Sequence, residues 1–268
     1  LHNLPFYGVA VMCSDDANTR ELIPSLGRRV VSYGFGERAD VRASGIERLG
    51  LKTRFTVQTN ERRKPLTVEL NLPGVHNVLN SLAAIAVAAE LEIDDAPLLK
   101  ALAEFSGVDR RLQVQGTVMT TVGPVTFVDD YGHHPTELAA TIAAARDAWP
   151  GRRLVVCFQP HRYTRTLALI DDFAQVLSTV DALILTNVYS AGETPLAGAD
   201  GKSLARAVRV RGAVEPIFIE DLSELPGVLA QILRAVDVVF TLGAGSIGAL
   251  ATMLPRALTA RVAARAKQ

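Results

Sequence analysis

The sequence has no excess of charge of either sign, since its 268 residues include 28 Lys and Arg and 28 Asp and Glu. A balanced chain has no surplus of cations to neutralise phosphates, so binding to nucleic acid through bulk charge is excluded. The chain also has only two cysteines, Cys13 and Cys157. Two cysteines exclude a disulfide scaffold and are typical of a reducing compartment.

Long apolar runs are missing as well. No run approaches the roughly 18 residues that a membrane-spanning helix needs, and no signal peptide is recognisable. We therefore expect a cytoplasmic protein with no nucleic-acid partner and no membrane partner. With 49% hydrophobic residues, the chain is nonetheless able to bury a sizeable core.

The hydrophobic pattern changes along the chain. Short apolar or alternating runs predict strands over 9–12, 29–33, 53–58 and 66–72. From Val75 the apolar residues recur at every third or fourth position, which predicts a helix, and a second helix is predicted over about 96–105.

Beyond Arg111, apolar strands alternate regularly with helical stretches. The predicted strands lie at 125–130, 154–159, 182–189, 216–220 and 237–242, and the helices begin near Pro135, Thr166, Gly201, Leu222 and Ser246. Such alternation predicts βαβ units and a mostly parallel, Rossmann-like sheet with helices on its faces. We place a domain boundary there and divide this α/β chain into 1–111 and 112–268.

Polar residues follow the predicted strands of the second domain. Three of the five histidines lie here: His133 and His134 follow the first strand, and His161 follows the second together with Arg162 and Arg165. The carboxyl ends of parallel strands meet at one edge, where α/β proteins bind ligands. Guanidinium forks suit carboxylate and phosphate oxygens, so this edge predicts an anion site.

Two alternatives at this edge stay open. Asp129 and Asp130 precede the helix at Pro135, and one of them is expected to help to cap it. A metal site made from Asp130, His133 and His161 is the other, although no Cys or His spacing in the sequence supports it.

Two glycine-rich segments resemble nucleotide-binding motifs. Residues 243–248 match G-x-G-x-x-G, but no acidic residue follows Asp237 to bind a ribose. We expect a closely packed turn from strand to helix there. Residues 198–203 resemble the end of a P-loop, but Leu196 occupies the place of the first glycine. The sequence therefore contains no true Walker A motif.

The helix that begins at Val75 carries a third feature. Asn77 and Asn80 are three residues apart on its first turn, beside His76. Carboxamides pair well with adenine, but asparagine also caps helices, and the sequence favours neither role. Arg110 and Arg111 add cations at the expected domain boundary, where a phosphate is a plausible ligand.

Taken together, these segments are similar to the Mur ligases of peptidoglycan synthesis. The similarity is carried by PGVHNVLN (73–80), GVDRR (107–111), DDYGHHPTE (129–137), FQPHRYTR (158–165) and VYSAGE (188–193). The third and fourth strings favour the members that join L-alanine to UDP-N-acetylmuramate over the murein-tripeptide ligases and the later amino-acid-adding ligases. The resemblance implies that 1–111 is the later part of a central ATPase domain and that 112–268 is a complete C-terminal domain.

The resemblance also implies a chemistry and a set of roles. ATP activates the muramyl carboxylate as an acyl phosphate, and L-alanine displaces the phosphate. Residues that the resemblance assigns to the nucleotide are His76, Asn77, Asn80, Arg111 and Asp130. Residues that it assigns to alanine and the acyl phosphate are Tyr131, His133, His161, Arg162 and Arg165. In these ligases the UDP-sugar domain, the P-loop and the Mg²⁺ ligands precede the part matched here, so we expect this chain to be inactive alone.

Two other classes of function compete with a ligase. One is a nucleotide- or anion-binding module without catalysis of its own. The other is a metal-dependent hydrolase built on the possible site at Asp130, His133 and His161. The sequence does not show selectivity for alanine over glycine or serine, or which histidine accepts the amine proton.

Overall fold

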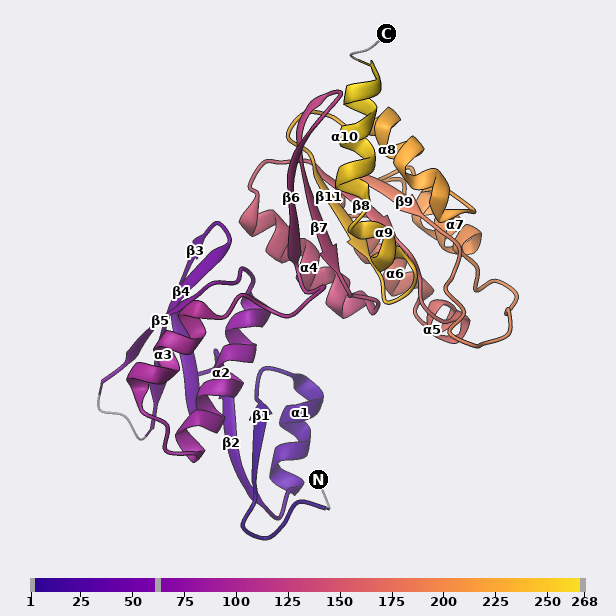
Figure 1. Cartoon of the computed structure of the whole chain (residues 1–268). Coiled ribbons are helices and arrows are strands. Elements are labelled where there is room, and N and C mark those ends of the chain that lie inside the picture. The colour runs from indigo at the N-terminus through magenta and orange to yellow at the C-terminus, as the bar shows by residue number, and fades with distance from the viewer. Residues whose placement is uncertain (1–2, 61–63, 266–268) are drawn as a thin grey trace. The chain divides into compact units, whose positions relative to one another are not determined.

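The computed structural model describes residues 3–60 and 64–265 and divides the chain into two compact units, Leu1–Gly107 and Val108–Gln268 (Figure 1). The division lies slightly before the boundary at 111/112 placed from the sequence. Within the described ranges, no helix has both the length and the apolar character needed to span a bilayer.

Unit 1 contains one five-stranded sheet in the order β1-β2-β3-β4-β5. The first three strands are parallel, and β3 to β5 are antiparallel. Its elements are β1 (Val9–Cys13), α1 (Ala17–Leu22), β2 (Arg29–Gly34), β3 (Val41–Leu49), β4 (Lys52–Thr59), β5 (Leu66–Leu70), α2 (Val75–Glu90) and α3 (Asp95–Glu104).

The core of unit 1 lies between its sheet and helix α2. Val78, Leu82 and Ile85 of α2 are fully buried against Val57 and Val68 of the sheet. Their spacing of three or four residues places them on one helical face, which confirms the helix predicted from Val75.

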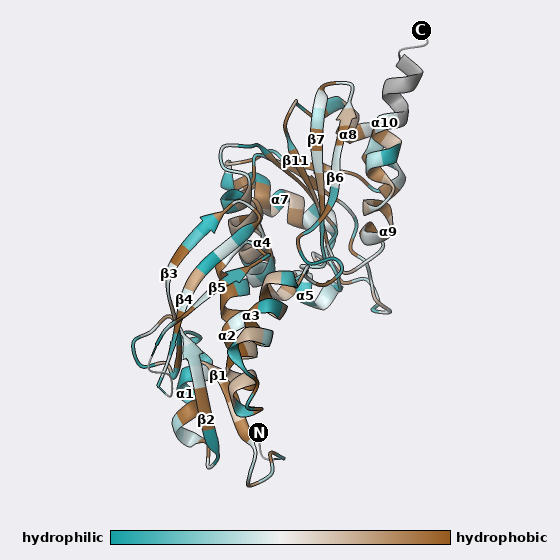
Figure 2. Cartoon of the chain, turned by 60° about the vertical axis from the view of Figure 1, so that its left-hand side comes forward, coloured by the Kyte–Doolittle hydropathy of each residue, from teal (hydrophilic) through white to brown (hydrophobic). Residues whose placement is uncertain are grey.

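Two elements of unit 1 were not predicted from the sequence. Helix α1 buries none of its residues, and Asp16 caps its start through the backbone N–H of Thr19. Strand β3 is exposed over most of its second half, where a β-bulge interrupts its pairing with β4. Figure 2 shows much teal, the colour of hydrophilic residues, along β3 and β4. Elements that bury so little leave no hydrophobic period for the sequence to display.

Unit 2 contains a six-stranded sheet in the order β10-β9-β8-β11-β7-β6. All neighbouring strands are parallel except β6 and β7, so the predicted mostly parallel sheet is confirmed. The strands are β6 (Gln113–Thr120), β7 (Gly123–Asp130), β8 (Leu154–Phe158), β9 (Ala182–Leu185), β10 (Ile217–Phe218) and β11 (Val238–Leu242). The α-helices are α4 (Pro135–Ala148), α5 (Tyr163–Ala168), α6 (Ile170–Leu177), α7 (Gly201–Arg211), α8 (Leu225–Ile232), α9 (Ile247–Ala251) and α10 (Leu254–Arg265).

The sheet of unit 2 is covered on both faces. Alternate residues of β8 point to opposite faces: Leu154, Val156 and Phe158 pack in the cluster with α4, α6 and α7. Val155 and Cys157 pack in the cluster with α8, α9 and α10. Complete burial raises the pKa of the Cys157 thiol, as expected of an inert structural cysteine.

Strand β11 lies between β7 and β8 and organises the carboxyl edge of the sheet. The helices that follow β7 and β8 pack on one face, whereas α9, which follows β11, packs on the other. The chain therefore leaves the carboxyl edge in opposite directions on either side of β11. Crevices of this kind are where doubly wound sheets bind ligands.

Candidate functional site

Four rings from three loops form a row at the carboxyl edge of unit 2. The His161 ring stacks on Tyr189, with centroids 5.5 Å apart and planes 18° apart. The His133 ring centroid is 5.6 Å from that of His161 and 5.4 Å from that of Tyr131. A parallel bridge between His161 and Tyr189 fixes the backbones of the two loops. The structure thus brings together Tyr131, His133 and His161, and adds Tyr189, which the sequence did not single out.

The surroundings of His161 favour its uncharged form. Its Nδ1 is buried and has no hydrogen-bond partner in the described part of the chain. Burial lowers the pKa of His161, and nearby His133, Arg165 and Arg162 lower it further, although Glu193 opposes them. An uncharged imidazole is able to accept a proton, and no hydrogen-bond donor in the described part of the chain occupies this buried nitrogen.

The two neighbouring histidines have different structural roles. Nδ1 of His133 lies 3.0 Å from the carbonyl oxygen of Tyr131. His134 caps α4: its Nδ1 accepts from the backbone N–H of Thr136, and the Glu137 carboxylate accepts from the backbone N–H of His134. The expectation that Asp129 or Asp130 caps this helix is wrong, because both lie within β7 and their carboxylates bind elsewhere.

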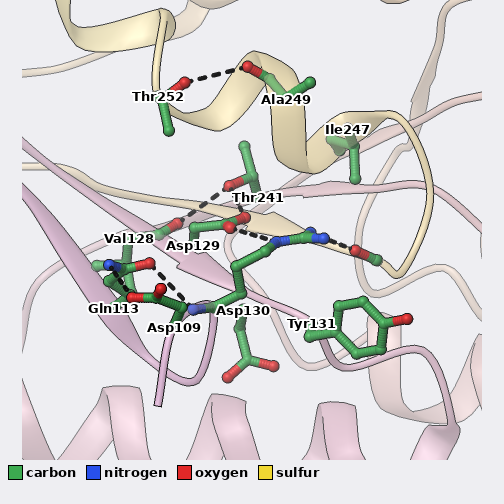
Figure 3. Close-up of polar contacts among 12 residues, drawn as sticks. Asp109, Gln113, Val128, Asp129, Asp130, Tyr131, Thr241, Ile247, Ala249 and Thr252 are labelled. Atoms are coloured by element: carbon green, nitrogen blue, oxygen red, sulfur yellow. Dashed lines mark hydrogen bonds and ion pairs between the residues drawn. The ribbon is translucent and has the colours of Figure 1, made fainter. Parts of the chain in front are cut away.

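Beneath Tyr131 lies a buried polar network. The Asp129 side chain is 2% exposed and accepts from Arg110 Nε at 2.8 Å and from Thr241 Oγ1 at 2.7 Å. Figure 3 shows the hydrogen bond that joins Thr241, on β11, to Asp129. Arg110 Nη2 also donates to the carbonyl oxygen of Gly243 at 2.6 Å, and its guanidinium lies 5.0 Å from the Tyr131 ring centroid.

Asp130 lies beside this network. We call the four residues Arg110, Asp129, Asp130 and Thr241 the floor. The two carboxylate oxygens of Asp130 accept from the backbone N–H groups of Leu112 at 2.8 Å and Gly132 at 2.7 Å. Burial raises the pKa of Asp130, and the two N–H groups partly offset the rise. Asp130 therefore holds the loop after β7 in place, and its carboxylate is buried within the unit.

Above the floor lies a more open group, which we call the rim (His161, Arg162, Arg165 and Glu193). Arg162 Nη1 is 3.4 Å from Glu193 Oε1, and Arg162 begins α5 with a φ of 72°. Glu193 also accepts from Thr164 N and Oγ1, which lowers the pKa of its carboxyl. Arg165 makes a 3.5 Å contact with the carbonyl oxygen of His161, and its side chain has no other hydrogen bond within the described part of the chain. Glu193 was missed as a site residue, although its position after the third parallel strand was a signal.

Arg111 differs from its neighbour Arg110. Its side chain is 49% exposed, its Nη1 lies 3.4 Å from Glu137 Oε1, and its guanidinium lies 5.8 Å from the Tyr131 ring centroid. Its guanidinium is thus open to a ligand beside the tyrosine, whereas that of Arg110 is committed to the floor.

Asn77 and Asn80 lie on the first two turns of α2, and His76 lies on its first turn. Asn77 Nδ2 donates to the carbonyl oxygen of Pro73 at 2.7 Å, and Asn80 Nδ2 lies 3.4 Å from Asn77 Oδ1. Gly74 occupies the N-cap, and no side chain caps this helix. The capping alternative for these asparagines is therefore wrong, and their carboxamides lie together on one surface.

The glycine-rich turn at 243–248 packs closely, as expected. A Cβ on Gly243 would lie 2.7 Å from the carbonyl oxygen of Gln159, and a Cβ on Gly245 would lie 2.7 Å from Tyr189 Cβ. A Cβ on Gly248 would collide with the guanidinium of Arg110. These glycines make room for the site's own side chains.

The segment that resembles a P-loop end is also explained by packing. A Cβ on Gly201 would collide with the carbonyl oxygen of Thr186, and the Asp200 side chain caps α7. Lys202 pairs with Glu220 and lies over the Phe218 ring. This lysine serves the fold.

The alternative metal site is not formed. Across residues 3–60 and 64–265, no group of three or more His, Cys, Asp or Glu side chains is placed to hold a metal ion. The carboxylate of Asp130 is occupied by backbone N–H groups, and Nδ1 of His133 faces a carbonyl oxygen. The alternative of a metal-dependent hydrolase, which was built on these residues, therefore has no support in the described structure.

Comparison with known families agrees with this arrangement. The family model described as "Mur ligase, glutamate ligase domain" matches residues 110–245, half of the chain. The chain belongs to the Mur ligase family. The model of the Mur ligase middle domain matches residues 1–88.

Individual relatives of this Mur ligase chain show which members of the family it resembles. The UDP-N-acetylmuramate–L-alanine ligase of Methylococcus capsulatus is 57% identical over 258 residues, which cover 96% of this chain and 54% of that protein. The ligase of the same name from Halorhodospira halophila is also 57% identical. That match covers 97% of this chain and 53% of the Halorhodospira protein. The chain thus spans about half the length of the curated relatives that it matches.

Solved structures show the same fold. The crystal structure of UDP-N-acetylmuramate–alanine ligase from Thermotoga maritima matches with a TM-score of 0.73 at 29% identity, covering 96% of this chain and 52% of that one. A MurF ligase from Thermotoga maritima, solved in complex with ADP, matches with a TM-score of 0.69 at 19% identity. The match covers 96% of this chain and 55% of the MurF chain. The α/β fold predicted from the sequence is therefore confirmed.

Proposed function

We propose that this chain is the nucleotide- and amino-acid-handling part of an ATP-dependent ligase that joins L-alanine to UDP-N-acetylmuramate. The observation that carries the proposal is the rim. There, Arg162 and Arg165 lie beside the neutral base His161 at the carboxyl edge of a parallel sheet. The names of the relatives at 57% identity support the choice of substrates.

The proposed reaction has two steps. In the first, an oxygen of the muramyl carboxylate forms a bond with the γ-phosphorus of ATP, and ADP leaves. In the second, the alanine nitrogen attacks the acyl carbon, inorganic phosphate leaves, and the nitrogen loses a proton. His161 is the candidate acceptor for that proton, because its surroundings favour the uncharged imidazole and its Nδ1 has no hydrogen-bond partner among the described residues.

The arginines divide between the two substrates in this proposal. Arg162 and Arg165 hold the alanine carboxylate, since a guanidinium fork binds two carboxylate oxygens at once. Tyr131 and His133 form the wall of this pocket. Arg111 contacts the transferred phosphate through its exposed guanidinium, where a fixed cation stabilises the developing charge.

The remaining assignments concern the nucleotide. The paired carboxamides of Asn77 and Asn80, with His76 on the first turn, form the proposed adenine site. Asp130 fixes the loop that carries Tyr131 and His133, and its proposed contact with the nucleotide requires that loop to open. The described residues offer no cluster for Mg²⁺, so no step here is assigned to a metal. As a nucleotide-consuming enzyme with no lipid substrate, the ligase would act in the cytoplasm.

A chimaera tests the proposal. The preceding part of the Methylococcus capsulatus relative, joined ahead of Leu1, should yield an enzyme that releases phosphate only when ATP, UDP-N-acetylmuramate and L-alanine are all present. Arg165→Gln should abolish most of this activity, whereas Arg256→Gln on α10 should not. A folded chimaera that binds ADP yet forms no product would instead favour an anion-binding module without catalysis.

A further inference from the structure

A second cationic site lies at the opposite edge of the unit 2 sheet. A pocket of about 500 Å³ is lined by Arg146, Arg152, Arg153, Arg234 and Asp181, and we call it the arginine pocket. Most of these residues immediately precede β8, β9 or β11. Because these strands are parallel, they start at one edge, away from the rim and the floor.

Three of the four guanidiniums are fixed by the backbone. Arg146 donates to the carbonyl oxygens of Arg152 and Thr179 as well as to Asp181. Arg152 donates to the carbonyl oxygens of Val236 and Asp237, just before β11, and Arg153 donates to that of Ile232, the last residue of α8. Side chains held in this way lose little further freedom when a ligand binds, so the pocket is preorganised.

The charge of the pocket is only partly neutralised. Asp181 pairs with Arg146 at 2.7 Å, and buried Asp237 pairs with Arg153 at 2.9 Å. Arg152 donates only to carbonyl and hydroxyl oxygens, and the exposed Arg234 side chain has no acceptor within the described ranges. Two guanidinium charges are therefore left without a carboxylate partner.

Donors are available as well as charge. A guanidinium carries five N–H groups. The bonds of Arg152 use its Nε and Nη2, which leaves Nη1, and those of Arg153 use Nη1, which leaves Nε and Nη2. Forked donors beside uncompensated charge match the oxygens of a phosphate group.

The lining also limits the class of ligand. Val180 and Ala213 are the apolar side chains of the pocket, and no aromatic side chain lines it. A nucleoside would find no ring on which to stack its base. We propose that the arginine pocket binds a small diphosphate-type anion, with its two phosphoryl groups between Arg152 and Arg234.

The test uses inorganic pyrophosphate and the whole 268-residue chain, at constant ionic strength. Saturable binding measured by calorimetry should be accompanied by shifts of the backbone amide signals of Gly151, Ala213 and Arg234 in a two-dimensional NMR spectrum. Shifts confined to the rim, or no saturable binding, would overturn the proposal.

Two variants, each with a matched control, sharpen the test. Arg234→Gln removes an unpartnered cation, and Ala213→Glu adds a carboxylate at an exposed position of the pocket. Each should weaken pyrophosphate binding about tenfold or more, because Arg234→Gln removes a charge-assisted hydrogen bond and Ala213→Glu places a negative charge against the anion. Arg256→Gln on α10 and Ala96→Glu on α3 make the same changes elsewhere and should leave the affinity unchanged. Equal affinity in all four variants would contradict the proposal.

Discussion

The floor and the rim are adjacent parts of one site, but their charged groups are satisfied to very different degrees. In the floor, Asp129 is 2% exposed and is paired at 2.8 Å with Arg110, which is itself bonded to Gly243. In the rim, Arg165 has one long contact and His161 has an unpartnered nitrogen. Groups of the floor are committed to the fold, whereas Arg165 and His161 of the rim are available to a ligand. Substitutions in the floor should therefore reduce stability, and those in the rim should reduce binding or activity.

The largest effect is expected from Arg110→Ala. It leaves the Asp129 carboxylate buried without its cation, which costs about 3–5 kcal/mol in the free energy of unfolding. Arg111→Ala is the matched control, because that exposed arginine has only a 3.4 Å ion pair and should cost less than about 1 kcal/mol. Denaturant unfolding of both variants measures the difference. Equal losses in the two variants would contradict the distinction between Arg110, which is committed to the floor, and the exposed Arg111.

Gly248→Ala should have the next largest effect. Overpacking should lower the free energy of unfolding by about 1–3 kcal/mol. Its new Cβ collides with the guanidinium of Arg110, which cannot move without releasing Asp129. The same substitution should cost little in the Arg110→Ala background, because the colliding group is gone, so the two losses should not add. Additive losses would show that Gly248 is needed for another reason. Gly27→Ala, at an open position, controls for glycine replacement.

Arg165→Gln should leave the free energy of unfolding nearly unchanged, since its side chain makes only the 3.5 Å contact. In the active chimaera it should raise KM for L-alanine about tenfold or more, as expected for one charge-assisted bond to a carboxylate. Steady-state kinetics with varied L-alanine give this value. An unchanged KM with reduced stability would show that Arg165 supports the fold, as the floor residues do, and does not bind L-alanine.

The smallest expected effect is the contribution of His161 to the pH dependence of the free energy of unfolding. Its pKa is lowered from the ordinary 6.5 in the folded chain, so the unfolded chain takes up a proton first as pH falls. This residue therefore contributes nothing above its unfolded pKa and destabilises the fold as pH falls below it. Unfolding at about pH 7.5 and about pH 5.5 should show a smaller decline in His161→Gln than in the unchanged chain. Parallel declines would mean that His161 keeps its ordinary pKa.

The elements that the sequence predicted well are those buried on both faces. The runs at 154–158 and 238–242 form β8 and β11, in which every residue is buried. By contrast, β6 was not predicted because it is an edge strand with mixed exposure, and the run predicted at 216–220 forms only the two-residue strand β10. Burial on two faces leaves a continuous apolar signal, and an edge strand does not.

The site shows the same limit at the level of single residues. The rule that loops meet at the carboxyl edge was enough to bring His133, His161 and Arg162 together. It was not enough to separate Arg110 from Arg111, which are identical and adjacent. Their difference depends on Asp129 and Gly248, distant in sequence, which supply a buried partner and an open space. Contacts of that kind depend on the folded backbone and have no local pattern.

The position of β11 has a consequence for how the protein is made. Thr241 of this strand bonds to Asp129 across a separation of 112 residues, and β11 is the last strand of its sheet to be synthesised. At ordinary translation rates, on the order of ten seconds pass between the emergence of β7 and that of β11. Until then the facing edges of β7 and β8 have no partner, and the floor cannot be completed because it includes Thr241 of β11. A ribosome that stalls before residue 238 should therefore hold a chain with two open strand edges, a substrate for chaperones.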